Sequence, residues 1–367
     1  MITIIGAGMG GLTLARILHL HSIPCIVLDA DVSPTSRHQG GMLDIHEDTG
    51  QAALQRAGLH AAFLERVLPG GEATRISDRT GTILLDEESA GGRPEIERGA
   101  LRALLIDALP AGMIRWNSKV TQAARSGEGF ALTFTDGHVE QATTLIGADG
   151  AWSKVRPLVS AARLAYTGIS FVELRYRQGE AGHAEAARLV GAGLAFALSD
   201  ERGFLGHREP SGEYHLYVEL RVPEDWHKQV VTAEVLQPFF TDWSADHQAL
   251  LSASQGPLLV RPIHALPVGH RWARTPGVTL VGDAAHLMSP FAGEGVNLAM
   301  ADAMDLADAI IAHPDDPSAA FASYEARMFP RAEEMAAGSA ENLALSFAAD
   351  TPKGLLALFA GFGDRRS

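Results

Sequence analysis

The sequence predicts an α/β protein with a Rossmann-like nucleotide-binding domain, an inserted and mostly antiparallel sheet domain, and a long C-terminal helix. Three observations support this fold class. A glycine-rich turn directly follows the first apolar strand, as in dinucleotide-binding folds. The central residues 163–260 alternate polar and apolar side chains with the period of a strand, and residues 321–347, rich in Ala and Glu, have helical periodicity.

Length, charge and cysteine content exclude several classes of protein. A chain of 367 residues is long enough for two domains. Its formal net charge of −14 disfavours a nucleic acid partner, because the phosphate backbone is also negative. The single cysteine, Cys25, excludes an internal disulfide and any multi-cysteine metal or iron–sulfur site, and we predict no metal. We expect a cytoplasmic protein without a membrane partner, because no signal peptide or membrane-spanning run is evident.

The N-terminal segment has the pattern of a βαβ unit that binds a dinucleotide. Residues 2–5 and 23–28 are apolar strands, and an amphipathic helix lies between them. Gly6, Gly8 and Gly11 form a G-x-G-x-x-G motif, which permits a tight turn, close approach of a pyrophosphate and close packing of the helix. The helix N-terminus stabilises the phosphate charge.

An acidic residue closes the second strand of this unit. Asp29 stands where a carboxylate can accept hydrogen bonds from ribose hydroxyls. The motif and this acid together predict FAD or NAD, and they do not distinguish between the two.

The remaining chain indicates that one domain is inserted into the other. Residues 278–281 form another buried strand, and residues 297–311 form a helix, so the nucleotide-binding pattern returns after the central block. We expect a discontinuous nucleotide-binding domain at residues 1–66, 93–160 and 258–325. The substrate-binding domain is expected at residues 67–92 and 161–257, and a bridging C-terminal helix at residues 326–367.

A second glycine-bearing loop decides between the two cofactors. Asp283 ends a buried strand, and the loop that follows contains Pro290, Gly293, Gly295 and Asn297 before a helix begins. Glycines let a flat ring approach the backbone, and the helix N-terminus stabilises the negative charge of a reduced flavin. The loop therefore favours FAD, and a loop that only caps the helix is the alternative.

These motifs resemble the flavoprotein monooxygenases of the p-hydroxybenzoate hydroxylase type. In that family the Gly-Asp pair places a carboxylate on the ribityl chain of FAD, which implies this contact for Asp283. The resemblance also implies that the following loop lies along the flavin ring, through Pro290, Gly293, Gly295, Val296 and Asn297.

Within that class, nearly the whole chain is similar to the tetracycline-inactivating flavin monooxygenases, or tetracycline destructases. Residues 40–51, 94–102, 153–157, 223–226 and 283–297 carry the similarity. It implies further FAD contacts from Arg37, Gly41, Asp44, Arg102 and Asp149. From the residues alone, two alternatives remain, because Asp149-Gly150 is also a common turn and Arg102 also fits an ordinary surface position.

The substrate contacts of that group transfer only in part. The resemblance places Glu173, His215, Phe291 and Asn342 at the substrate. However, Glu173 and Leu194 stand where the group has a glutamine and an arginine, and losing the arginine weakens recognition of an anionic enolate. We therefore expect a polycyclic or phenolic substrate, with tetracycline, and hence antibiotic resistance, as one candidate. An ordinary sheet position is the alternative for His215.

The resemblance implies a reaction as well as a fold. NADPH would reduce FAD transiently, and O2 would then form a flavin C4a-hydroperoxide that hydroxylates an aromatic or polyketide small molecule. Because the cofactor carries the oxidation, no side chain is assigned as catalytic, and His286 is expected to make a structural hydrogen bond. Three alternatives stay open: an FAD-dependent oxidase or reductase, an NAD-dependent dehydrogenase that uses only the first motif, and a non-catalytic flavoprotein that binds a ligand.

Overall fold

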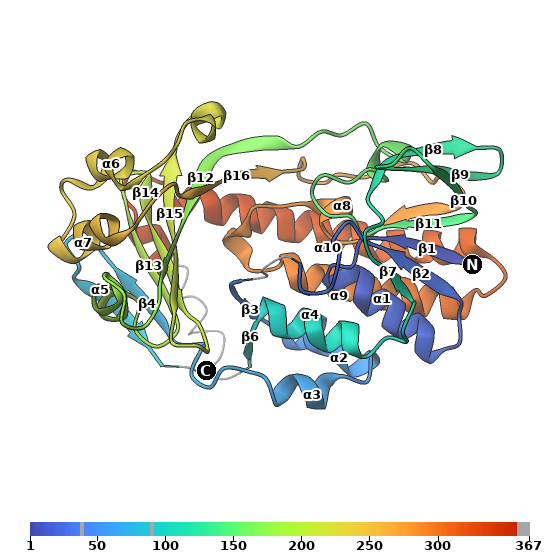
Figure 1. Ribbon diagram of the computed structural model, residues 1–367, viewed down its shortest axis with the longest axis horizontal. Coiled ribbons are helices and arrows are strands. Elements are labelled where there is room, and N and C mark those ends of the chain that lie inside the picture. The colour runs from blue at the N-terminus through green and yellow to red at the C-terminus, as the bar shows by residue number, and fades with distance from the viewer. Residues whose placement is uncertain (37–39, 89–91, 358–367) are drawn as a thin grey trace. The chain divides into compact units, whose positions relative to one another are not determined.

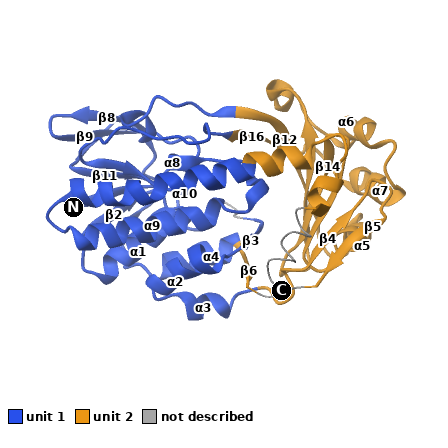
Figure 2. Cartoon of the chain, turned by 180° about the vertical axis from the view of Figure 1, so that it is seen from behind, with its two compact units in different colours: residues 1–67, 98–165, 265–339 blue, residues 68–97, 166–264, 340–367 orange. Residues whose placement is uncertain are grey.

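The computed structural model describes residues 1–36, 40–88 and 92–357 (Figure 1). The chain forms two compact units, each assembled from three separate segments (Figure 2). Unit 1 comprises residues 1–67, 98–165 and 265–339, and unit 2 comprises residues 68–97, 166–264 and 340–367. The division falls inside the long helix α10 (Pro317–Ser346), which therefore contributes residues to both units.

Unit 1 is built on a five-stranded parallel sheet with the order β17-β11-β1-β2-β7. Its strands are almost wholly apolar because both faces are covered, as is usual for a parallel sheet. Helix α1 contacts one side of β1 and β2, and β11 contacts a three-stranded antiparallel sheet, β10-β9-β8. The strands are β1 (Ile2–Ile5), β2 (Cys25–Leu28), β7 (Ile114–Arg115), β8 (Val120–Ser126), β9 (Gly129–Phe134), β10 (Val139–Ala142), β11 (Thr144–Gly147) and β17 (Val278–Leu280).

The helices of unit 1 pack closely around α1. A Cβ atom at Gly10 would lie 2.9 Å from the Ala299 carbonyl oxygen, so the glycine is what lets α1 and α9 approach each other. Unit 1 also contains the short strand β3 (Met42–Asp44). Its helices are α1 (Met9–Leu20), the π-helix η1 (Glu47–Gln51), α2 (Ala52–Arg56), α3 (His60–Leu64), α4 (Arg98–Asp107), η2 (Arg156–Leu158), α8 (Asp283–His286), η5 (Pro290–Ala292) and α9 (Gly295–Ala312).

Unit 2 is built on a seven-stranded sheet with the order β16-β12-β15-β14-β13-β4-β5. The pairings between β12, β15, β14 and β13 are antiparallel, and β13 pairs with β4 in parallel. The strands are β4 (Thr74–Ser77), β5 (Ile83–Glu87), β12 (Ala165–Tyr176), β13 (Leu194–Ser199), β14 (Arg202–Arg208), β15 (Tyr214–Arg221) and β16 (Leu259–Ala265), and the short β6 (Glu95–Glu97) also belongs to this unit.

The two faces of this sheet differ in chemistry. Alternate residues, such as Leu174 on β12 and Val218 on β15, form an apolar core with the helices of the unit. The opposite face carries Glu173, His215 and Glu219, because side chains alternate along a strand. The helices of the unit are α5 (His183–Val190), η3 (Glu224–Lys228), α6 (Ala233–Leu236), η4 (Gln237–Phe240) and α7 (Ala245–Ala253).

The predicted α/β fold class is confirmed, and three details differ. Residues 96–109 have the periodicity of a helix, but Glu95–Glu97 is extended and α4 begins only at Arg98. Residues 51–57 also have helical periodicity, and there a π-helical turn precedes α2. Helices α5, α6 and α7 interrupt the block expected to be sheet, and they supply the apolar side chains that bury one of its faces. Over the described ranges, no helix has the length and apolar character needed to cross a bilayer.

Candidate functional site

In the first glycine turn, Gly6 and Gly11 have no space for a side chain, whereas Gly8 does. Gly6 has a φ of +108°, and a Cβ atom there would lie 2.3 Å from the Ala148 carbonyl oxygen. At Gly11 a Cβ atom would lie 2.0 Å from the Gly6 carbonyl oxygen. At the exposed Gly8, in contrast, no described atom lies within 4 Å of the Cβ position. An open backbone at the start of a helix suits an incoming phosphate.

The side chains of Asp29 and Arg102 both form hydrogen bonds with the backbone of this turn. The Asp29 carboxylate accepts hydrogen bonds from the amides of Ala7 (2.6 Å) and Asp31 (2.8 Å). Arg102, only 3% exposed, donates to the carbonyl oxygens of Ala7 (3.1 Å) and Pro34 (3.1 Å) and to the Asp31 carboxylate (3.0 Å). An ordinary surface position for Arg102 is therefore wrong, because its guanidinium group fixes the glycine turn to the segment after β2.

Asp149 and Arg156 organise the loop after β11. The Asp149 carboxylate accepts hydrogen bonds from the Ser153 hydroxyl (2.6 Å) and the Lys154 amide (2.6 Å), as a turn-forming aspartate does. The buried Arg156 then donates to the Ala284 carbonyl oxygen at 3.2 Å. This arginine therefore ties the Asp149 loop to the loop that begins with Asp283.

A buried carboxylate positions the start of the Asp283 loop. Gly282 has a φ of +59°, and its amide donates to Asp302 Oδ2 at 2.9 Å. The same oxygen lies 2.6 Å from His286 Nε2, and Arg331 lies 2.9 Å from the other oxygen. Burial alone would raise the pKa of Asp302, but the charges of His286 and Arg331 hold it below its ordinary value. His286 thus makes a structural contact, while the Asp283 side chain is exposed.

Asn297 fastens the far end of this loop to the strand before η1. Its side-chain oxygen accepts a hydrogen bond from the His46 amide at 2.9 Å. Its side-chain nitrogen donates to the carbonyl oxygens of Asp44 (2.9 Å) and Gly293 (3.4 Å). Because Asn297 is fully buried, its amide group is engaged with backbone groups and sets the shape of the glycine loop.

A histidine lies between two carboxylates beside this loop. His46 Nε2 is 2.8 Å from Asp44 Oδ2, and His46 Nδ1 is 3.2 Å from Glu294 Oε1. Burial would lower the pKa of His46, but hydrogen bonds and charges from both carboxylates raise it to about 9. His46 is therefore a doubly protonated cation at neutral pH. This cluster could not be predicted from the sequence, because no local pattern places residue 46 beside residue 294.

The other residues predicted to bind FAD lie mainly in the same unit. Gly41, with a φ of +94°, accepts a hydrogen bond from the Arg98 amide at 3.0 Å. Pro290 begins η5, and Gly295 begins α9 with no described atom within 4 Å of its Cβ position. Val296 is half-buried in the first turn of α9. Arg37 lies outside the described residues.

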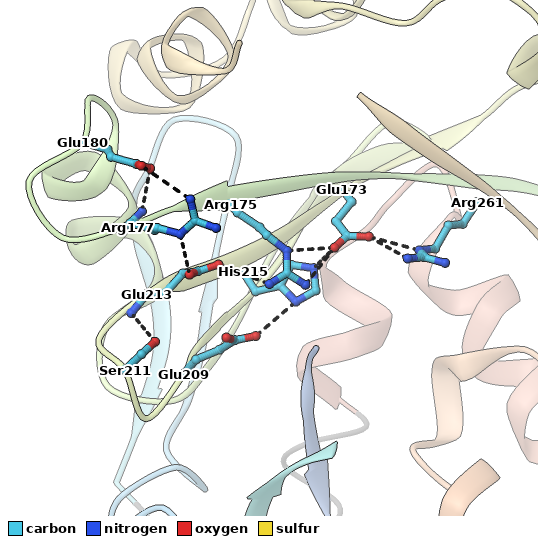
Figure 3. Close-up of polar contacts among 9 residues, drawn as sticks. All are labelled: Glu173, Arg175, Arg177, Glu180, Glu209, Ser211, Glu213, His215 and Arg261. Atoms are coloured by element: carbon cyan, nitrogen blue, oxygen red, sulfur yellow. Dashed lines mark hydrogen bonds and ion pairs between the residues drawn. The ribbon is translucent and has the colours of Figure 1, made fainter. Parts of the chain in front are cut away.

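In unit 2, Glu173 is the centre of a charged cluster on the polar face of the sheet (Figure 3). Figure 3 shows its carboxylate between three cationic side chains. His215 Nε2 lies 3.1 Å from Oε1, Arg175 Nε lies 2.9 Å from the same atom, and Arg261 Nη2 lies 2.9 Å from Oε2. His215 is only 3% exposed, and its other ring nitrogen lies 3.4 Å from Glu209.

These contacts fix the charge state of the cluster. The hydrogen bond from His215 lowers the pKa of Glu173, and Arg261 and Arg175 lower it further. Burial works against a charged His215, but Glu173 and Glu209 raise its pKa above the ordinary value. Glu173 is therefore an anion that accepts hydrogen bonds from Arg175 and Arg261 and lies beside the His215 ring. Arg175 and Arg261 were not predicted from the sequence. They place positive charge on this face of the sheet, which the uncharged Leu194 does not provide.

The two remaining predicted substrate residues belong to different units. Phe291 lies in η5 of unit 1 and is half-buried. Asn342 lies near the end of α10, in the part of that helix that belongs to unit 2, and is also half-buried. Among the four, Glu173 and His215 are in direct contact with each other. Across the described part of the chain, no group of three or more His, Cys, Asp or Glu side chains is arranged to hold a metal ion.

Comparison with known proteins identifies the family. The family model described as FAD binding domain matches residues 1–339. Monooxygenase asqM of Emericella nidulans is 31% identical over 94% of this chain and 95% of its own length. The structure of Klebsiella pneumoniae HpxO with FAD and uric acid has a TM-score of 0.79 at 22% identity, covering 98% of this chain and 92% of that one. The structure of tetracycline destructase Tet(51) has a TM-score of 0.74 at 20% identity, covering 95% and 92%.

The chain belongs to the FAD binding domain family, and it is an FAD-dependent monooxygenase. The class predicted from the two glycine loops is therefore confirmed. The match extends through the Asp283 loop, so the alternative of an NAD-dependent dehydrogenase that uses only the first motif is excluded. The two solved structures share the fold with this chain.

Two glycine variants separate packing from cofactor binding. Gly11→Ala is expected to destabilise the apoprotein by roughly 1–3 kcal/mol, because the new Cβ atom overlaps the Gly6 carbonyl oxygen. Gly8→Ala is the matched control and should leave the unfolding free energy unchanged, while weakening FAD binding by about tenfold or more. Denaturant unfolding of apoprotein and fluorescence titration with FAD measure the two effects. Wild-type FAD affinity in Gly8→Ala would contradict a phosphate site at this turn.

The His46 cluster predicts a pH-dependent contribution to stability. Because the pKa of His46 is raised from 6.5 to about 9, its stabilisation is complete below pH 6.5 and is lost as the pH rises through 9. His46→Gln should therefore lower the unfolding free energy by about 2 kcal/mol at pH 6 and by little at pH 9.5.

A second change should rescue this variant at the lower pH. Glu294→Gln in the His46→Gln background removes one of the two facing carboxylates, so part of the lost stability is expected to return. His60→Gln, whose ring contacts the neutral Gln51 side chain, is the control and should show no such pH dependence. An equal loss at both pH values in His46→Gln would contradict a charged His46.

Proposed function

We propose that this monooxygenase uses NADPH or NADH and O2 to hydroxylate an aromatic or polyketide small molecule. The observation that carries the proposal is the match to FAD-binding monooxygenases along the chain, together with two preformed glycine loops in unit 1. FAD, when bound, supplies the chemistry that activates oxygen. The protein's part is to bind and orient the cofactor and the substrate.

The residues of unit 1 fit FAD. The open position at Gly8 admits the pyrophosphate to the N-terminus of α1, and Asp29 retains lone pairs for a ribose hydroxyl. Asp283 is exposed at the N-terminus of α8 and suits the ribityl hydroxyls. Gly293 and Gly295 present backbone without side chains to a flat ring. The contacts of Arg102, Asp149 and Asn297 described above hold these segments in place.

The remaining predicted FAD contacts also belong to this proposal. Asp44 lies at the end of β3, where its carboxylate faces Gly293. Gly41, Pro290 and Val296 lie in the same two segments, and Arg37 precedes them in the sequence. We assign unit 1 to the cofactor and unit 2 to the substrate.

The cluster on the polar face of unit 2 supports a substrate with oxygen substituents. Both ring nitrogens of His215 face carboxylates, those of Glu173 and Glu209, whereas the exposed Arg261 guanidinium has further N–H groups that can donate to an acceptor such as a phenolic or carbonyl oxygen. Glu173, which contacts all three cationic side chains, acts by fixing His215 and Arg261. Phe291 and Asn342 complete the proposed set. Tetracycline and the smaller uric acid are two compounds that have such oxygen substituents.

A panel of compounds of increasing size tests the reaction. We expect a yellow protein that binds FAD and oxidises NADPH slowly alone and at least tenfold faster with its substrate. The panel is uric acid, 4-hydroxybenzoic acid, naphthol, dihydroxyanthraquinone and tetracycline, and product masses are recorded under labelled O2. Label in the product separates a monooxygenase from an oxidase or reductase. Binding without turnover would instead favour a ligand-binding flavoprotein, and protein that stays colourless with FAD would refute the proposal.

A further inference from the structure

Glu219 lies on the polar face of the sheet of unit 2 without a partner of its own. It is four residues after His215 on β15, and its side chain lies on the face opposite to the apolar core that Val218 and Leu220 help to form. Glu219 is only 1% exposed, and neither carboxylate oxygen has a hydrogen-bond partner within the described residues. This differs from Glu173 on the neighbouring strand, which accepts hydrogen bonds from Arg175 and Arg261.

Its surroundings are apolar. Phe171 on β12 and Gly203 on β14 are the residues directly opposite Glu219 on the two flanking strands. The Leu198 side chain fills the place where a Cβ atom of Gly203 would lie. Burial alone raises the pKa of Glu219 to about 8. Glu219 is therefore a neutral carboxylic acid at pH 7, with a proton to donate.

The charged groups on the same face are engaged elsewhere. Arg221, the next residue of β15 on this face, pairs with Glu201 and lies over the Phe347 ring. On β12 the charged residues are Glu173 and Arg175, which pair with each other, and on β14 His207 contacts Glu95. Glu219 consequently has no role in the cluster around Glu173.

An unpartnered buried acid is unfavourable for stability, so its presence calls for an explanation. A neutral acid loses its hydrogen bonds to water on burial, and a leucine of similar size would avoid that loss. Buried polar groups in proteins normally have partners, and exceptions concentrate at binding and catalytic sites. A ligand oxygen is the partner that would satisfy Glu219.

We propose that Glu219 is a specificity-determining residue that donates a hydrogen bond to an oxygen of the substrate. The inference rests on the proposed function, since it takes this face of the sheet as the one that meets the substrate. His215 and Glu219 are four residues apart on one strand, which is about 13 Å. Between them lies Tyr217, whose ring centroid is 5.4 Å from that of Phe171. The geometry fits an extended ring system with oxygens near both ends, such as a polycyclic polyketide, better than a single-ring phenol.

Two variants of the FAD-loaded enzyme test this role, with dihydroxyanthraquinone and tetracycline as probes. For whichever of the two probes the wild-type enzyme turns over, Glu219→Leu should raise the KM about tenfold. It should leave FAD affinity unchanged and leave the midpoint of thermal unfolding equal or higher. A merely structural acid would instead lower the midpoint when replaced. Glu201→Gln, which removes an exposed carboxylate that pairs with Arg221 on the same strand, is the control and should leave KM unchanged.

The pH profile gives an independent measurement. In the wild type KM should rise about fivefold between pH 7 and pH 9, because ionised Glu219 no longer donates, whereas Glu219→Gln keeps a donor and should show a flat profile. If Glu219→Leu fails to fold, this comparison decides. An unchanged KM in Glu219→Leu, or equal profiles in the wild type and Glu219→Gln, overturns the inference.

Failure of the proposed function is distinguishable from failure of this inference. If no panel compound stimulates NADPH oxidation, the proposed function fails. The role of Glu219 is then tested separately, by measuring the binding of dihydroxyanthraquinone to the same variants through tryptophan fluorescence. Turnover of single-ring compounds alone, unaffected by Glu219→Leu, would uphold the monooxygenase and refute the role of Glu219.

Discussion

The structure of unit 1 depends on the hydrogen bonds and ion pairs of the buried Asp302 carboxylate. This carboxylate binds the amide of Gly282, the imidazole of His286 and the guanidinium of Arg331, and so connects the end of β17 with α8, α9 and α10. Without its partners, each of these buried groups would be a poorly solvated charge or an unsatisfied donor. Removing one partner therefore leaves the others unpaired. These contacts set the path of the backbone from the end of β17 to Asp283.

Several residues of unit 1 hold protein segments to one another. Asn297 joins the glycine loop to the segment after β3, Arg156 joins the loops after β11 and β17, and Arg102 joins the first glycine turn to the segment after β2. Such contacts fix the backbone before a ligand arrives, which reduces the conformational entropy lost on binding. The sequence motifs therefore determine the backbone shape of unit 1 through contacts within the protein.

The sequence predicted those parts of the molecule whose causes are local. Strand, turn and helix periods identified both glycine loops, because each loop needs small residues at fixed spacing. The partners of His46 and Glu173 were not predictable, since Glu294 and Arg261 reach them only through the tertiary fold. The alternation of β15 placed Glu219 beside apolar neighbours in the sequence, but only its burial and missing partners set it apart.

The position of His46 between Asp44 and Glu294 also constrains how this protein can evolve. A change that removes the imidazole leaves two carboxylates facing each other, and a change at residue 294 that removes the negative charge weakens the hold on the cation. Neither position is therefore free to drift alone. Among relatives that diverge at this loop, residues 46 and 294 should be inherited as a matched pair, so that their covariation records a contact that neither position reveals by itself.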